Sequence, residues 1–173
     1  MNQTKKITLC GVMIALALAL SYTERLIPLQ MLVPLPGIKL GLANIVTLVA
    51  LYLFGKKSAY TILILRCVLG AVFGGGITGL MFSLTGGVLA LSVMAIAQRI
   101  PCFSIYGVSI LGAAAHNIGQ ILAAIVLMQS IYIGSYLPYL LVVALFTGLA
   151  TGSAAAGVIY VLKKITRDNS EFI

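Results

Sequence analysis

The sequence predicts an all-α integral membrane protein with six transmembrane helices and with both termini in the cytoplasm. The 173-residue chain is 61% hydrophobic and only 8% charged, whereas soluble domains carry about 25% charged residues. Its basic residues also alternate, because eight of the eleven fall in every second gap between apolar stretches. Cytoplasmic loops are enriched in Lys and Arg, so the alternation indicates six spans. The eight residues are Lys5, Lys6, Lys56, Lys57, Arg99, Lys163, Lys164 and Arg167.

The expected spans cover residues 7–22, 40–54, 58–73, 77–97, 108–128 and 137–162 of a single transmembrane domain, residues 1–173. Crossing the hydrocarbon core takes about 20 residues, so the second and third spans are short. Three prolines within residues 24–39 disfavour a regular helix and predict a partly apolar outer loop. The glycines at residues 74–76 form a turn that ends the third span. The polar tail, residues 163–173, is expected to be loose.

The formal net charge of +8 does not indicate a nucleic-acid-binding protein, because the basic residues are scattered over loops and form no single patch. Anionic lipid headgroups of the bilayer are their expected partners. The three cysteines have neither disulfide nor metal spacing and are interpreted as small packing residues.

A stripe of small residues runs along the first span, where Gly11, Ala15 and Ala19 recur at four-residue spacing. Such a stripe lets another helix approach closely in lipid. The stripe therefore predicts either ordinary packing within this chain or the docking of a partner subunit.

Arg66 lies near the middle of the third expected span. A charged group at that depth costs about 2.5–3.5 kcal/mol on insertion scales, so it normally faces protein or a water-filled cavity. Gly70 and Gly74 follow at four-residue spacing and leave space beside the guanidinium. Arg66 is therefore a candidate anion contact in a substrate cavity, or else a structural arginine bonded to backbone carbonyls or amides.

A second polar group lies on the fifth span, where His116 and Gln120 share a helix face with Asn117 beside them. Buried amides and imidazoles need partners in hydrocarbon, which predicts either a cavity lining or a hydrogen-bonded seam between helices. Asn44 could join either arrangement. Lys39, at the outer mouth of the second span, either guides an anionic substrate or reaches the interface. We expect these groups and Arg66 to open onto a shared cavity.

The residues that are absent exclude several functions. The three acidic residues, Glu24, Asp168 and Glu171, are all expected outside the spans, and no nucleotide-binding loop of the form G-x-x-x-x-G-K-[ST] is present. No paired carboxylates can hold magnesium and a diphosphate. We therefore expect no enzyme, no metal site and no cofactor, and uptake against a gradient would require a partner that supplies the energy.

Three motifs together resemble a bacterial family. They are the stretch from Pro36 to Asn44, the pair Arg66-Cys67 followed by the three glycines, and the stretch from His116 to Gln120. The chain resembles, over about residues 5–165, the Gx transporters, also labelled heptaprenyl diphosphate synthase component I. That family is similar in turn to the substrate-binding S components of energy-coupling factor (ECF) transporters.

The resemblance implies a six-helix S-component-like bundle in the bacterial plasma membrane, working with a coupling subunit and ATPases. The A-x-x-x-A stripe of such proteins docks on the coupling subunit, and Ala15 and Ala19 match it. We therefore expect a non-catalytic subunit that binds a small anionic, isoprenoid or flavin-like solute. Its predicted binding residues are Arg66, His116, Asn117, Gln120, Asn44 and Lys39. The alternative is an accessory membrane subunit of a soluble heptaprenyl diphosphate synthase or of a redox assembly.

Overall fold

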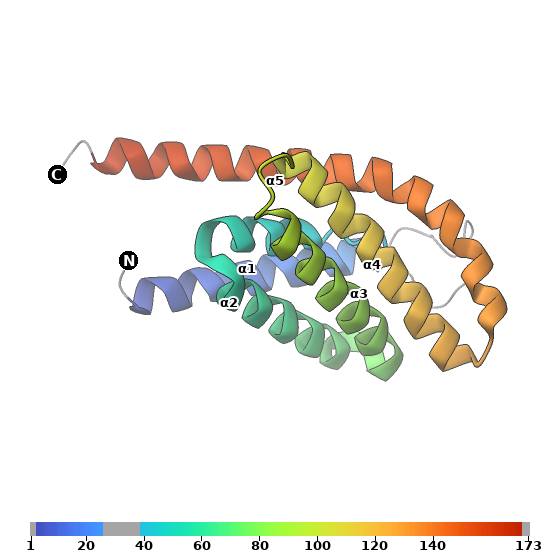
Figure 1. Ribbon diagram of the computed structural model, residues 1–173. Helices are drawn as coiled ribbons and strands as arrows, with labels where there is room; N and C mark the ends of the chain where they lie inside the picture. Colours follow the sequence, from blue (N-terminus) through green and yellow to red (C-terminus); the bar gives the residue numbers. More distant parts are fainter. Residues whose placement is uncertain (1–2, 26–38, 171–173) are drawn as a thin grey trace.

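The computed structural model describes residues 3–25 and 39–170, and these residues are almost entirely helical (Figure 1). Five α-helices follow one another along the chain: α1 (Gln3–Arg25), α2 (Asn44–Gly70), α3 (Gly76–Ala97), α4 (Ile105–Met128) and α5 (Leu137–Ser170). A π-helical turn, η2 (Ala71–Gly75), joins α2 to α3, and a 3-10 helix, η3 (Ile131–Tyr136), precedes α5. The all-helical class is confirmed for the described residues.

Helix α2 is two helical segments, because its backbone leaves the helical conformation at Gly55 (φ 78°, ψ 178°). A positive φ of this kind is readily adopted only by glycine. Figure 1 shows the ribbon of α2 changing direction sharply between its two parts. A second interruption follows in η2, at Phe73 and Gly74. This interruption confirms the turn expected from the run of glycines.

Within the described residues, four stretches are long and apolar enough to cross a membrane: Thr4–Glu24, Asn44–Ala97, Ile105–Met128 and Ile131–Lys164. The second has 54 residues. As one straight helix it would extend about 80 Å, far beyond a hydrocarbon core of about 30 Å. The breaks at Gly55 and in η2 divide it into three helical segments.

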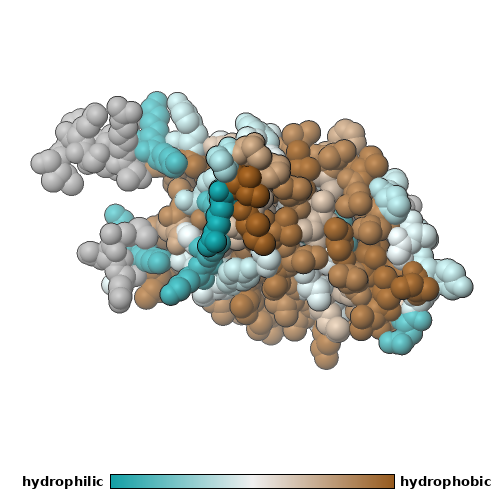
Figure 2. Space-filling model, viewed as in Figure 1, coloured by the Kyte–Doolittle hydropathy of each residue, from teal (hydrophilic) through white to brown (hydrophobic). Residues whose placement is uncertain are grey.

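The surface has the polarity expected of a multi-pass membrane protein. Figure 2 shows hydrophobic residues covering the middle of the visible face, with hydrophilic residues gathered toward its two ends. The start of α1 and the end of α5 lie at the same end of the molecule (Figure 1). Large apolar side chains such as Val72, Ile77 and Phe146 are at least 70% exposed, as lipid-facing residues are.

Two boundaries differ from expectation. Residues 40–43 form a turn before α2 rather than the start of a span. The last helix also extends beyond the expected end at residue 162, because α5 continues to Ser170. The loop expected at residues 24–39 falls mostly outside the described residues.

The helices are not equally tightly packed. The backbones of α3 and α4 touch, since a Cβ added at Gly119 would lie 2.7 Å from the Cα of Gly86. Helix α5 approaches α4 as closely, at Gly148 and Ile110. By contrast, among the described helices, the backbone of α1 comes near that of α2 alone. Among the described α-helices, α1 is therefore the one with a single helical neighbour.

Candidate functional site

Arg66 is buried in the second part of α2, with 6% of its surface exposed. Its Nη2 donates a hydrogen bond to Asn44 Oδ1 at 3.3 Å. Its Nε has no hydrogen-bond partner among the described residues. The two residues are therefore hydrogen-bonded partners within α2. Because an arginine stays charged, the site retains a cation with an unused N–H donor.

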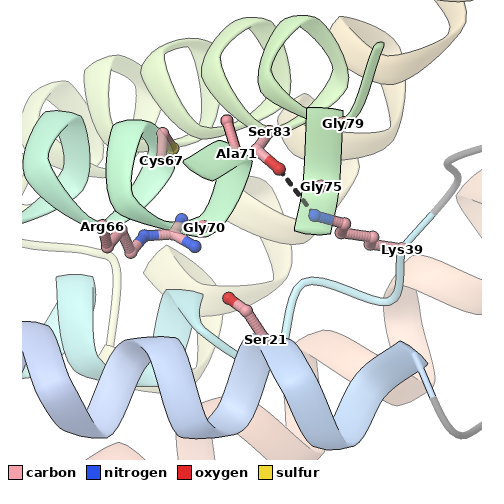
Figure 3. Close-up of a pocket in the computed structure, with 9 residues that line it drawn as sticks. All are labelled: Ser21, Lys39, Arg66, Cys67, Gly70, Ala71, Gly75, Gly79 and Ser83. Atoms are coloured by element: carbon pink, nitrogen blue, oxygen red, sulfur yellow. Dashed lines mark hydrogen bonds between the residues drawn. The ribbon is translucent and has the colours of Figure 1, made fainter. Parts of the chain in front are cut away.

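Lys39 comes to the same place from the turn before α2. Its Nζ donates to Ser83 Oγ of α3 at 2.7 Å (Figure 3). Figure 3 shows the ammonium of Lys39 and the guanidinium of Arg66 facing the same space, with the hydroxyl of Ser21 directed toward it from α1. The site therefore brings two basic side chains and two hydroxyls together from four parts of the chain.

A buried carboxylate holds the turn that carries Lys39. Glu24 is 3% exposed, and its Oε1 accepts hydrogen bonds from the backbone N–H groups of Gly41 and of Leu42, the latter at 3.3 Å. Gly41 has a φ of +85°, and a Cβ there would lie 2.9 Å from the side-chain nitrogen of Asn44. Only glycine suits this position, because both the positive φ and the close contact exclude a side chain.

The expectation that every acidic residue lies outside the spans is wrong for Glu24. The candidate span of α1 extends through this residue, and the carboxylate is buried against the start of α2. Its two backbone donors satisfy a group that would otherwise be costly to bury.

The amide and imidazole of α4 support the same turn from the other side. In the amide orientation that gives both its atoms complementary partners, the Gln120 oxygen accepts from the Lys39 N–H at 3.0 Å and from His116 Nε2 at 3.2 Å. The Gln120 nitrogen donates to the Lys39 carbonyl at 3.1 Å. The predicted shared face of His116 and Gln120 is therefore confirmed, as a hydrogen-bonded seam.

Asn117 points elsewhere. Its Nδ2 donates to the carbonyl oxygen of Leu140 at 2.7 Å, which links α4 to α5. Its contact is thus structural, and Asn117 does not join the cluster around Arg66.

The two basic side chains line a cavity of about 10 Å³. This volume has room for about one water molecule. Its walls are made largely of small residues, and they include neither Asn44 nor the polar residues of α4. The expectation of one cavity shared by all six candidate residues is therefore wrong. The lining residues, drawn in Figure 3, are Ser21, Lys39, Arg66, Cys67, Gly70, Ala71, Gly75, Gly79 and Ser83.

A larger groove lies directly beside this cavity, between the end of α1 and η2. Its volume is about 440 Å³, within the range of about 300–1,000 Å³ typical of small-molecule sites. Two residues, Ser21 and Gly70, line both hollows. The remaining groove residues are Leu18, Ala19, Tyr22, Thr23 and Phe73.

Several of these residues were not predicted from the sequence. Ser21, Ser83 and Glu24 carry no local motif, and serines are common in membrane helices. One signal was available, because Gly70 and Gly74 were expected to leave space beside the arginine. Gly70 does line the cavity, but Gly74 does not, and Gly75 lines it instead. Within the described residues, no group of three His, Cys, Asp or Glu side chains could hold a metal ion.

The small-residue stripe of α1 is exposed within the described part of the chain, and its last member, Ala19, also lines the groove beside η2. Gly11, Ala15 and Ala19 are all exposed, and a Cβ added at Gly11 would have no atom within 4 Å. Among the described residues, Gly11 and Ala15 are therefore not covered by another helix of this chain.

Comparison with known proteins identifies the family. The family model described as heptaprenyl diphosphate synthase component I matches residues 13–158. The chain belongs to this family. The match covers all six candidate site residues, both hollows and most of the stripe on α1. No curated protein and no solved structure matches the chain.

Proposed function

We propose that this family member is a non-catalytic, membrane-embedded binding subunit of an ECF-like uptake system in the bacterial plasma membrane. Its ligand carries an anionic group, and partner subunits supply the energy. The observation that carries the proposal is the convergence of Arg66 and Lys39 on one cavity, whose other walls come from the candidate spans of α1 to α3. A buried cation such as Arg66 within a candidate membrane span commonly marks a substrate pathway.

The site lacks what diphosphate chemistry requires. The chain has three acidic residues in all, and the one at the site, Glu24, already accepts from two backbone amides. No pair of carboxylates is left to hold magnesium beside a diphosphate. Binding without catalysis is the function that these residues support.

The six helical segments form six membrane crossings with both termini in the cytoplasm. This topology places the loop between α3 and α4, which contains Cys102, on the cytoplasmic side. Cys102 is exposed, whereas Cys67 is buried and Cys10 is half-buried. We expect a membrane-impermeant maleimide to label Cys102 only after the cells are permeabilised. The Cys102→Ser variant is the control, and labelling of Cys102 in intact cells would contradict the topology.

The exposed stripe of α1 supports docking on a coupling subunit. Ala15→Trp is expected to leave the fold intact and to remove the ATPases and coupling subunit from the affinity-purified complex, because an indole blocks close helix approach. Leu16→Trp is the matched control, since Leu16 is a neighbouring residue of α1, 52% exposed and outside the stripe. Equal recovery of ATPases with both variants would argue against docking through this face.

A second function is favoured by the family description, which implies the partner subunit of a synthase. In that case the chain is an accessory membrane subunit that holds a prenyl diphosphate or anchors a soluble synthase. Purification from native membranes separates the two functions. A complex that contains a soluble prenyl synthase and no ATPase supports the accessory role, whereas ATPases with a coupling subunit support uptake.

A further inference from the structure

We propose that the ligand is a single-chain amphiphile, whose phosphate-type head occupies the cavity at Arg66 while its apolar chain lies in the adjoining groove. The proposal rests on the proposed function, because it uses the same anion site. It adds the class of ligand and the route of entry, which is sideways from the bilayer.

The two basic side chains of the cavity indicate a phosphate-type head. Arg66 Nε has no partner among the described residues, and the guanidinium fork matches phosphate oxygens better than any other side chain does. Lys39 reaches across the cavity to Ser83 (Figure 3). In this proposal an entering anion replaces Ser83 Oγ as the acceptor for Nζ. Lys39 must move aside to admit it, because the cavity as it stands holds about one water molecule.

The adjoining groove indicates that the ligand has an apolar chain. The cavity and the groove share Ser21 and Gly70, so a head at Arg66 has a direct exit into the larger space. Leu18, Tyr22 and Phe73 give the groove a mainly apolar wall. A ligand that was polar throughout would leave this wall without complementary contacts, whereas an aliphatic chain gains from covering it.

The packing of α1 favours entry of the ligand sideways from the bilayer. Among the described helices, the backbone of α1 comes close to α2 and not to α3. The groove lies between the end of α1 and the junction of α2 with η2, where the backbone departs from regular helical geometry at Phe73 and Gly74. Tyr22 and Phe73 at its rim are 62% and 69% exposed. A chain already in the bilayer therefore reaches the groove without crossing water.

The test uses purified protein in phosphatidylcholine nanodiscs and three probes: farnesyl diphosphate, inorganic diphosphate and farnesol. The first carries both head and chain, and the other two carry one part each. We expect farnesyl diphosphate to bind at least about tenfold more tightly than either part, because the two hollows are contiguous. Arg66→Gln is expected to weaken farnesyl diphosphate binding by about tenfold or more, because charged hydrogen bonds are lost.

A matched pair of variants examines the groove. Phe73→Ser should weaken farnesyl diphosphate binding and leave inorganic diphosphate binding unchanged. Val72→Ser should change neither, since Val72 is similarly exposed, at 73%, and does not line the groove.

The outcomes separate the two proposals. Equal affinity for inorganic diphosphate and farnesyl diphosphate, both lost in Arg66→Gln, overturns the amphiphile and leaves the anion-binding function standing. Binding of all three probes that is insensitive to Arg66→Gln overturns both. Displacement of farnesyl diphosphate by an equal concentration of phosphatidylglycerol shows that a two-chain lipid fits the site, which overturns the single-chain assignment.

Discussion

Gly119→Ala is expected to lower the free energy of unfolding by about 3 kcal/mol, the upper part of the range for overpacked cores. A Cβ at this position would lie 2.7 Å from both the Cα of Gly86 and the carbonyl oxygen of Thr85. Both contacts are with backbone, so α3 and α4 must separate to admit the methyl group. The measurement is the melting temperature of the detergent-purified protein, followed by size-exclusion chromatography after heating.

Gly157→Ala is the matched control for this variant. Gly157 is an exposed helical glycine of α5, and a Cβ there would meet nothing within 4 Å. Alanine favours a helix over glycine by about 0.5–1 kcal/mol, so this variant should be slightly more stable than the wild type. Equal melting temperatures for Gly119→Ala and the wild type would show that α3 and α4 are not in backbone contact.

Glu24→Ala is expected to destabilise the protein by about 2–4 kcal/mol. The substitution removes the acceptor for the Gly41 and Leu42 N–H groups, and each buried donor left without a partner costs about 1–3 kcal/mol. Because this turn carries Lys39, ligand binding should weaken along with stability. Chemical unfolding of the purified protein and ligand titration measure the two effects.

Glu24→Gln distinguishes the hydrogen bonds from the negative charge. The amide of glutamine keeps a carbonyl oxygen as acceptor, so most of the stability should return. If Glu24→Gln proved as unstable as Glu24→Ala, the charge beside Arg66 and Lys39 would be the main contribution of Glu24, and its hydrogen bonds to the turn a minor one.

Much of the fold could be predicted because its signals are local or periodic. The basic residues at chain ends and loops locate the breaks between helical segments, and the glycines at residues 74–76 mark the turn between α2 and α3. The turn at residues 40–43 was missed because it depends on contacts distant in sequence. The side chains of Glu24 and Gln120 hold this turn, and the residues next to Gly41 in the sequence do not indicate either contact.

The site was predictable only where a residue type conflicted with its surroundings. Arg66 was found because a charge stands out in an apolar stretch, and the pairing of His116 with Gln120 follows from helical periodicity. Ser21 and Ser83 could not be found, because a hydroxyl in a membrane helix can bond to its own backbone and carries no distinctive signal. Asn117 is adjacent to His116 in α4, but its side chain is hydrogen-bonded to α5. Which neighbour Asn117 contacts depends on how α4 packs, and the sequence pattern does not indicate it.

The central claim is that the buried guanidinium of Arg66 binds an anionic ligand. Identification of the small molecules that the purified protein retains tests this claim most directly. The measurement is mass spectrometry of the compounds released from wild-type protein and from Arg66→Gln, both purified from native membranes in mild detergent. We expect an anionic compound that is stoichiometric with the wild type and lost from Arg66→Gln, with the variant still monodisperse and helical. Retention of the same compound by both proteins, or of no anionic compound by the wild type, would contradict the account.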